Sequence, residues 1–464
     1  MTRIRRPRPG TPRSVRAVPR SVRAVPRSVQ VASAALALTG MLAGPACAAD
    51  ADPARRAGPA VTAGPAALGL SVTPGAGPTD GVVPLTPDVT SRLDAAIRQL
   101  MNEASIPGVI VGYTAPGGGY QRTFGVADQT TGAPMSPDMY VRLGSVTKTF
   151  TTTAVLRLAD QGRLDLDDPV STYVPDVPGG DGITLRQLGE MRSGLSDYAQ
   201  DADFRQAVVD DPNRPYTPEE LLAYAFRHPA DFPPGTRFGY SNTNTILLGL
   251  VVEKVSGRPV GDFLKAQVFT PAGLHRTVFP TDATFPDPHP RGYTRDPRDG
   301  SVVDATDFNP SWGWASDAAI SNLADLRTWS KALATGEPLL EPATQAERLK
   351  GKPTGVPGID YGFGVLDVHG WVGHPGTTPG YGSLVVYLPK AHASLVILLN
   401  TDVPYQDSDL STLLAEAITK IVTPNDVYTL PPRPTGSAPA SSPTLASSPS
   451  SPSSPTSPSS DAIG

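Results

Sequence analysis

Strand-like segments lie near both ends of the part of this chain expected to fold, and a long helical stretch separates them. Runs typical of strands occur at residues 108–115 and 120–128, and again at 362–368, 371–374, 383–388 and 394–400. Helix patterns span 89–103, before the first strands, and 409–422, after the last one. This order predicts an α+β fold: an antiparallel sheet made from both ends of the chain and flanked by N- and C-terminal helices, with a mainly helical region inserted at about residues 150–300.

The first 48 residues have the composition of an export signal. They carry nine arginines and no acidic residue, and the apolar run at 29–42 is too short to span a bilayer comfortably. Ala46-Cys47-Ala48 resembles a signal-peptidase site, so we expect cleavage after Ala48 and a secreted, extracellular or cell-wall-associated protein. Lipidation at Cys47 is the alternative, although the residues before it form a poor lipobox. The sequence leaves the choice between Sec and twin-arginine export open.

Two further segments are expected not to fold. Residues 49–86 are rich in alanine, glycine and proline, which is typical of a flexible linker. Residues 426–464 consist mostly of serine and proline, with almost no charged or large apolar side chains to bury. We therefore expect one folded domain at 87–425, with a helix that begins near Thr86-Pro87-Asp88.

Charge and cysteine content exclude several classes of partner. The whole chain has 39 basic and 44 acidic residues, and loss of the first 48 residues would leave 30 basic residues and a net charge near −14. Such an acidic protein is not expected to bind nucleic acid or an anionic membrane surface. The single cysteine lies in the segment expected to be removed, so we expect neither disulfides nor a cysteine-rich metal site.

A possible nucleophile occurs in the sequence Gly144-Ser145-Val146-Thr147-Lys148. Positions three apart on a helix share a face, so the Ser145 hydroxyl and the Lys148 amine can touch. A serine needs a neighbouring base, and lysine can serve where burial lowers its pKa, whereas arginine cannot. Only eight of the 39 basic residues are lysines. About half a chance match of this spacing is expected in such a chain, so the motif alone decides nothing.

Two later motifs carry groups that would complement this serine. In Tyr240-Ser241-Asn242, the phenol could relay protons and the carboxamide could orient a substrate carbonyl. In the segment 372–377, the glycines would allow a substrate backbone to lie close to a strand, His374 adds a polar or partly cationic group, and the Thr377 N–H could pair with that of Ser145 as an oxyanion hole. Taken singly, the first motif is also compatible with an ordinary loop, and the second with a histidine that ends a strand.

The residues around these motifs resemble one known family. Gly-Ser-Val-Thr-Lys, Tyr-Ser-Asn-Thr-Asn and Gly-His-Pro-Gly-Thr are similar to the motifs of serine β-lactamases and penicillin-binding proteins. The likeness is closest to class C-like members, including soluble D-alanyl-D-alanine carboxypeptidases, and covers roughly residues 88–425. It implies a β-lactamase/transpeptidase-like catalytic domain without a cofactor or metal.

The resemblance also implies a role for each matching residue. Ser145 would attack a carbonyl, Lys148 and Tyr240 would share the proton transfers, and the choice of acylation base is disputed in this family. Substrate binding would fall to the remaining matches, namely Asn242, His374, Gly376, Thr377 and Trp312. Trp312 would line the cleft, although a buried core tryptophan is an equally good interpretation. The implied partner is a small molecule or peptide: a peptidoglycan stem peptide, an ester or a β-lactam.

Several departures from the family pattern concern specificity. His374 stands where many members have a lysine, and Pro375 replaces a residue that is often threonine. The arginine that grips the substrate carboxylate in the carboxypeptidase should fall near Leu366, where there is none, and Met191 stands where a histidine is frequent. We expect a complete acyl-enzyme machinery of a D-alanyl-D-alanine carboxypeptidase-like peptidase that acts on peptidoglycan-type peptides, with esterase, β-lactamase, D-amino-acid peptidase or amidase activity on the same machinery as the alternatives.

Other functional classes are less compatible with the sequence. A low-turnover β-lactam- or muropeptide-binding module would need neither Lys148 nor Tyr240. The Gly-x-Ser-x-Gly elbow of an α/β-hydrolase is absent from the sequence, as is the His-Glu-x-x-His motif of many zinc enzymes.

Overall fold

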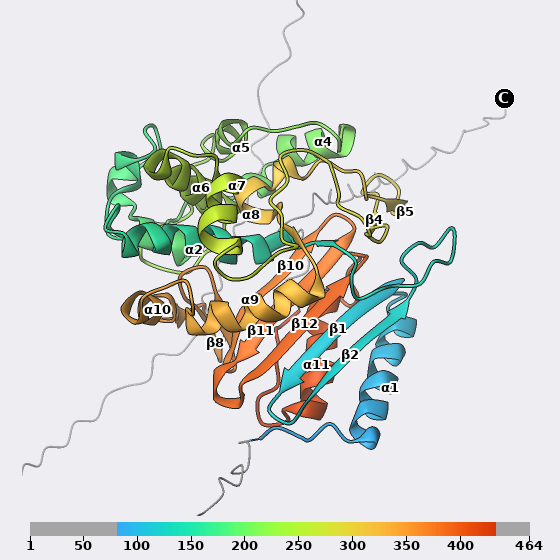
Figure 1. Cartoon of the computed structure of the whole chain (residues 1–464). Coiled ribbons are helices and arrows are strands. Elements are labelled where there is room, and N and C mark those ends of the chain that lie inside the picture. The colour runs from blue at the N-terminus through green and yellow to red at the C-terminus, as the bar shows by residue number, and fades with distance from the viewer. Residues whose placement is uncertain (1–80, 433–464) are drawn as a thin grey trace, which may run out of the picture. The chain divides into compact units, whose positions relative to one another are not determined.

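The computed structural model describes residues 81–432, shown in Figure 1. The expected signal segment 1–48, nearly all of the expected linker 49–86 and most of the expected tail 426–464 lie outside the described residues. The proposed cleavage site and Cys47 lie there too.

An eight-stranded antiparallel sheet forms the centre of the fold (Figure 1). Its spatial order is β2-β1-β12-β11-β10-β9-β8-β7, so the N-terminal hairpin pairs with a strand from the C-terminal part of the chain. The strands are β1 (Gly108–Ala115), β2 (Gly118–Gly125), β7 (Lys352–Pro353), β8 (Ile359–Tyr361), β9 (Leu366–Val368), β10 (Trp371–Thr378), β11 (Tyr381–Leu388) and β12 (Ala393–Leu399). Two short pairs lie apart from it, β3 (Val141–Arg142) with β6 (Ile320–Ser321) and β4 (Tyr293–Arg295) with β5 (Val302–Asp304).

The two terminal helices cover one face of this sheet. They are α1 (Pro87–Glu103) and α11 (Leu410–Val422), and they pack against each other as well as against the sheet. Side chains alternate between faces along a strand, and β1 follows this rule, because Val109 and Val111 pack with these helices whereas Ile110 packs on the other side. The Thr86 hydroxyl accepts a hydrogen bond from the Val89 N–H and so caps α1, which begins where the sequence predicted, near Thr86-Pro87-Asp88.

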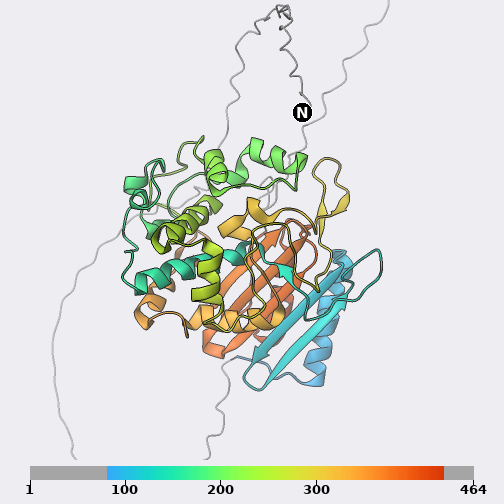
Figure 2. The ribbon, with the colours of Figure 1, turned by 45° about the horizontal axis from the view of Figure 1, so that its top comes forward.

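The inserted helical region lies over the opposite face of the sheet (Figures 1 and 2). Helix α9 contacts β11 and β12 directly, and α2 and α6 are paired above it. The α-helices of this region are α2 (Thr147–Asp160), α3 (Leu185–Gly189), α4 (Ala202–Asp210), α5 (Pro218–Ala225), α6 (Asn242–Ser256), α7 (Val260–Leu264), α8 (Trp314–Asp317), α9 (Leu323–Thr335) and α10 (Pro342–Arg348). Single turns are η1 (Gly144–Val146), η2 (Val170–Thr172), η3 (Gly180–Gly182), η4 (Tyr198–Gln200), η5 (Lys265–Phe269), η6 (Pro310–Trp312) and η7 (Pro389–Ala391).

The predicted fold class is confirmed, and the differences are local. Strand β10 continues past His374 to Thr378, even though Pro375 has no N–H to donate. This is possible because β9 pairs only with Trp371–Gly373, which leaves the second half of β10 bonded to β11 on one side alone. That free edge of β10 faces the segment that carries Ser145.

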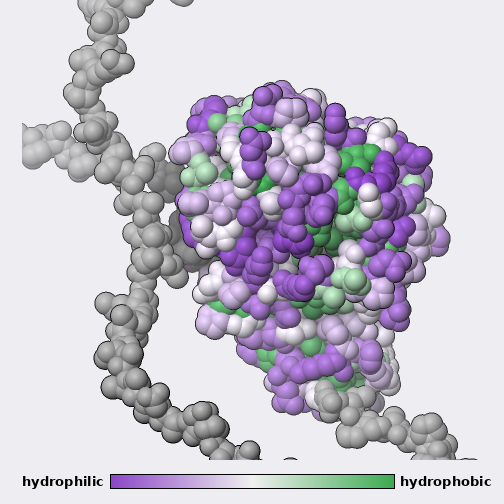
Figure 3. Space-filling view, turned by 90° about the vertical axis from the view of Figure 1, so that its left-hand side faces the viewer, coloured by the Kyte–Doolittle hydropathy of each residue, from purple (hydrophilic) through white to green (hydrophobic). Residues whose placement is uncertain are grey.

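Within the described residues, few large hydrophobic side chains are exposed to solvent. No helix within residues 81–432 is both long and apolar enough to cross a bilayer. The face shown in Figure 3 is largely hydrophilic, with hydrophobic residues gathered in small patches. Within the described residues, the large hydrophobic side chains that are exposed are Val302, Leu349 and Val356.

Candidate active site

Ser145 is held against the free edge of β10 by two close backbone approaches. It lies in η1, one turn before α2, and Gly144 before it adopts a positive φ of 52°. A Cβ on Gly144 would lie 2.6 Å from the carbonyl oxygen of Thr377, and one on Gly376 would lie 2.0 Å from that of Leu143. Both positions therefore require glycine, and the Ser383 hydroxyl donates to the Leu143 carbonyl at 2.7 Å to fix the contact.

The Ser145 hydroxyl lies between a lysine and a carboxylate. Lys148 Nζ is 2.9 Å from Ser145 Oγ, as the three-residue spacing predicts, and Asp317 Oδ1 is 2.9 Å from the same oxygen on its other side. Asp317 Oδ2 lies 3.6 Å from Lys148 Nζ, so the two charged groups also form an ion pair. The side chains of Lys148 and Asp317 are 0% and 1% exposed, which makes this a fully desolvated cluster.

Burial and charge act in opposite directions on Lys148. Burial is the largest effect and lowers the pKa of the ammonium, whereas the carboxylates of Asp317 and Asp197 raise it. Burial also raises the pKa of Asp197 to about 6, although hydrogen bonds from Ala199 and Asn242 and the charge of Lys148 oppose that shift. The cluster therefore holds ionisable groups whose protonation states depend on one another.

Asn242 ties this cluster to the start of α6. Its side-chain oxygen accepts from the Ser316 hydroxyl at 2.8 Å, and its Nδ2 donates to Asp197 at 3.2 Å. The Asn242 backbone N–H also donates to Asp197. The Asn242 amide therefore joins Asp197 to Ser316, the residue before Asp317.

Tyr240, Tyr361 and His374 form a cluster of rings that contacts Lys148 through Tyr240. Tyr240 is half-buried, and its ring centroid is 5.1 Å from Lys148 Nζ. His374 lies near Tyr240 and Tyr361, and its Nε2 is 3.3 Å from the Tyr361 hydroxyl. Burial, together with the charge of Lys148, lowers the pKa of His374 to about 3. Of the two states expected from the sequence, polar or partly cationic, this lowered pKa favours the neutral, polar imidazole at neutral pH.

Of the remaining residues predicted from the sequence, Gly376 and Thr377 lie beside Ser145, whereas Trp312 lies in the core. Gly376 and Thr377 lie on the β10 edge beside Gly144, although the Thr377 hydroxyl donates away from Ser145, to Asp409 at 3.1 Å. Trp312 is 4% exposed, belongs to the core on the helical side, and its carbonyl accepts from Tyr198. Its packing thus agrees with the alternative interpretation, a core tryptophan.

Asp317, Asp197 and Tyr361 also belong to this cluster and were not predicted from the sequence. Asp317 is 172 positions from Ser145, and no local spacing links them. A signal did exist, because Asp317 interrupts a run of small and apolar residues, Ala315 to Ile320, that is buried throughout. An acidic residue is almost never fully buried unless it is paired, so such a run indicates a partner elsewhere in the chain.

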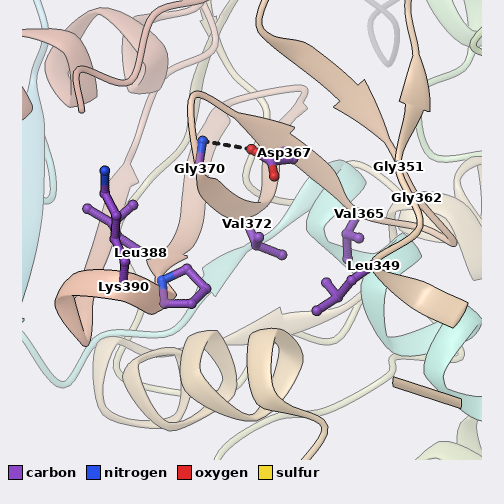
Figure 4. Close-up of a pocket in the computed structure, with 10 residues that line it drawn as sticks. Leu349, Gly351, Gly362, Val365, Asp367, Gly370, Val372, Leu388 and Lys390 are labelled. Atoms are coloured by element: carbon purple, nitrogen blue, oxygen red, sulfur yellow. Dashed lines mark hydrogen bonds between the residues drawn. The ribbon is translucent and has the colours of Figure 1, made fainter. Parts of the chain in front are cut away.

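A separate cavity lies away from this cluster. It is lined by Leu349, Gly351, Gly362, Val365, Asp367, Gly370, Val372, Leu388, Pro389 and Lys390, and encloses about 320 Å³. Figure 4 shows Asp367 accepting a hydrogen bond from the Gly370 N–H, a contact that closes the β9–β10 turn. Within residues 81–432, no three His, Cys, Asp or Glu side chains gather as ligands of a metal ion would.

Comparison with known proteins agrees with this arrangement. Residues 93–419 match the family model described as Beta-lactamase. The chain belongs to the β-lactamase family. Among curated members of this family of serine hydrolases, it is 27% identical to Penicillin-binding protein 4* of Bacillus subtilis over 339 residues, which cover 68% of this chain and 72% of that protein.

Solved structures of the β-lactamase family include two amide-hydrolysing relatives. A D-stereospecific amidohydrolase from Streptomyces sp. is 32% identical, with a TM-score of 0.61, and the match covers 68% of this chain and 94% of that one. The D-amino acid amidase from Ochrobactrum anthropi SV3 is 27% identical, with a TM-score of 0.64 and coverage of 72% and 97%.

Proposed function

We propose that this chain is a serine hydrolase that acts through an acyl-enzyme on Ser145, with peptides or amides of D-amino acids as substrates. The observation that carries the proposal is the desolvated contact of Ser145 Oγ with Lys148 Nζ at 2.9 Å, directly beside the free edge of β10. A hydroxyl in such a contact can be deprotonated as it attacks a carbonyl.

Each neighbouring group has a part in the proposed reaction. Lys148 and Tyr240 share the proton transfers between nucleophile and leaving group, which their contact across the Tyr240 ring supports. The backbone N–H groups of Ser145 and Thr377 hold the oxyanion, as the close approach of Gly144 to Thr377 supports. Asn242 orients the cluster, and His374 offers a neutral imidazole at the β10 edge.

Two substrate classes compete for this site. A D-alanyl-D-alanine carboxypeptidase must bind a carboxylate next to the scissile bond, which calls for a cation. His374 is uncharged, and position 366 on neighbouring β9 holds leucine. Hydrolysis of a D-amino-acid amide, peptide amide or ester needs no such cation, so these two observations favour amidase or esterase activity over carboxypeptidase or β-lactamase activity.

The two classes can be separated with matched substrates. The purified chain would be assayed on an acylated D-alanyl-D-alanine with a free carboxylate, on its C-terminal amide, and on D- and L-phenylalanine amide. We expect turnover of the amides, preference for the D-configured compounds and loss of turnover in Ser145→Ala. Faster hydrolysis of the free acid than of its amide would instead establish the carboxypeptidase. A stable adduct without product would point to a low-turnover binding module.

Export is a further part of the proposal. The arginine-rich start, the apolar run at 29–42 and Ala46-Cys47-Ala48 support removal of residues 1–48 and function outside the cytoplasm, with 49–86 as a linker and 426–464 as a tail. N-terminal sequencing of the protein collected from the medium of an expressing bacterium should begin at Ala49. A protein retained in the cell with its original N-terminus would contradict export.

A further inference from the structure

Asp317 contacts the nucleophile Ser145, and none of the roles implied by the family resemblance accounts for this contact. It ends α8, and its Oδ1 lies 2.9 Å from Ser145 Oγ, as close as Lys148 Nζ. Gly313 allows this position, because a Cβ there would lie 2.6 Å from that of Asp317. Gly313 thus packs against the Cβ of Asp317, and the carboxylate of Asp317 contacts the reacting Ser145 oxygen.

The directions of the hydrogen bonds around Ser145 make Asp317 the acceptor of the serine hydrogen. An ammonium can only donate a hydrogen bond, and Ser145 has one hydrogen. When Lys148 donates to Ser145 Oγ, the serine hydrogen must go to another acceptor, and Asp317 Oδ1 is in place. The ion pair of Lys148 with Asp317, at 3.6 Å, and the charge of Asp197 nearby favour the ammonium, whereas burial is the larger effect and lowers its pKa.

We infer that Asp317 is a third catalytic residue, the group that takes the proton of Ser145 when the acyl-enzyme forms. This rests on the proposed function. The O–H bond of Ser145 breaks and its proton passes to Asp317 Oδ1 while the bond from Ser145 Oγ to the substrate carbonyl carbon forms, and the carbonyl electron pair moves onto the oxygen.

The ion pair of Lys148 with Asp317 also supplies the proton for the leaving group. As the carbon–nitrogen or carbon–oxygen bond of the substrate breaks, the departing atom takes a proton from the Lys148 ammonium, with Tyr240 beside it. The proton on Asp317 then crosses to the Lys148 amine and restores the ion pair. The net result is transfer of the Ser145 proton to the leaving group, so no other acid, base or co-reactant is required.

The test measures the nucleophilicity of Ser145 directly. A fluorophosphonate reacts with the serine by forming an oxygen–phosphorus bond and losing fluoride, and the rate of labelling is followed by intact mass. In Asp317→Asn the shape is kept but the acceptor is no longer basic, so we expect labelling to slow by about 100-fold or more. The matched control is Asp325→Asn, another buried carboxylate, which accepts hydrogen bonds from Arg276 N and Thr277 Oγ1 and should label within about threefold of wild type.

A second readout uses the wild-type protein, so it does not depend on the folding of a variant. If Asp317 is the acceptor, labelling slows at alkaline pH as Lys148 loses the proton that supports the alkoxide. If the Lys148 amine were the base, labelling would instead speed up over the same range. Groups from the other packed elements that face Lys148 enter this profile, namely Asp317 on α8, Asp197 before η4, Tyr240 before α6 and His374 on β10.

The outcomes separate the inference from the function on which it rests. Slow labelling of Asp317→Asn, together with a labelling rate of the wild type that falls at alkaline pH, supports Asp317 as the proton acceptor. Labelling of Asp317→Asn within about threefold of wild type, or a rising alkaline limb, overturns it while leaving Ser145 as the nucleophile. Failure of wild type to be labelled on Ser145 would refute the proposed function and the inference together.

Discussion

Replacement of His374 by glutamine should change how the stability of the fold depends on pH. The pKa of His374 is lowered from 6.5 to about 3, first by burial and then by the charge of Lys148. Between these values the unfolded chain binds a proton at this position and the folded chain does not. The free energy of unfolding therefore falls as the pH falls below 6.5, and this loss levels off near pH 3.

The size of the effect follows from the two pKa values. One proton bound only by the unfolded state changes the free energy of unfolding by about 1.4 kcal/mol per pH unit. From pH 7 to pH 4.5, His374 should remove roughly 2.5 kcal/mol of stability. Glutamine cannot take up this proton, so the free energy of unfolding of His374→Gln should fall by that much less between pH 7 and pH 4.5. Any loss of stability from the missing contact with Tyr361 is the same at each pH and does not change this difference.

Urea unfolding at several pH values between 7 and 4.5 measures the difference between the two proteins. The pKa of Asp197, raised to about 6, acts in the opposite direction, since its contribution grows as the pH falls through 6, but it is present in both proteins and cancels. His275→Gln, at an exposed position, controls for the loss of an imidazole as such. Stability differences that stay constant over this range would show that His374 is not buried and neutral as described.

Three further variants test other parts of the structure. Gly144→Ala would place a methyl 2.6 Å from the Thr377 carbonyl oxygen at a φ of 52°, so urea unfolding should show a loss of about 1–3 kcal/mol and fluorophosphonate labelling should slow at least tenfold; wild-type values would refute the proposed packing. Thr86→Ala removes the cap of α1 and should lower the free energy of unfolding by about 1 kcal/mol, whereas no change would mean that the cap does not stabilise the helix. Lys148→Met breaks the buried ion pair with Asp317 and should lower the free energy of unfolding by about 3–5 kcal/mol. The double variant Lys148→Met with Asp317→Asn should recover part of that loss, whereas purely additive losses would argue against the ion pair.

Local and periodic features of the sequence predicted most of the fold. The start of α1 near Thr86, the strand at β1 and the apolar face of α11 are set by neighbouring residues, so they could be assigned without knowing the structure. The extent of β10 could not, because a proline is tolerated there only where β9 has already ended. That condition depends on which strand lies alongside.

The same distinction applies to the candidate site. Ser145 and Lys148 meet because they are three positions apart on one helical turn, which the spacing predicts. Asp317 reaches the same oxygen across 172 positions, and Asp197 acts on Lys148 from a separate loop. The neutral state of His374 likewise depends on burial and on a charge that the sequence does not place beside it.

The central claim is that Ser145 carries the acyl group during turnover. The most direct measurement is acid quenching of the purified chain within its first turnovers on an activated ester of D-phenylalanine, followed by intact mass and peptide mapping, with Ser145→Ala treated in parallel. The account predicts a gain of one D-phenylalanyl group, located on Ser145, that decays as product forms and is absent from the variant. Equal product formation by Ser145→Ala, or an acyl group on another residue, would contradict it.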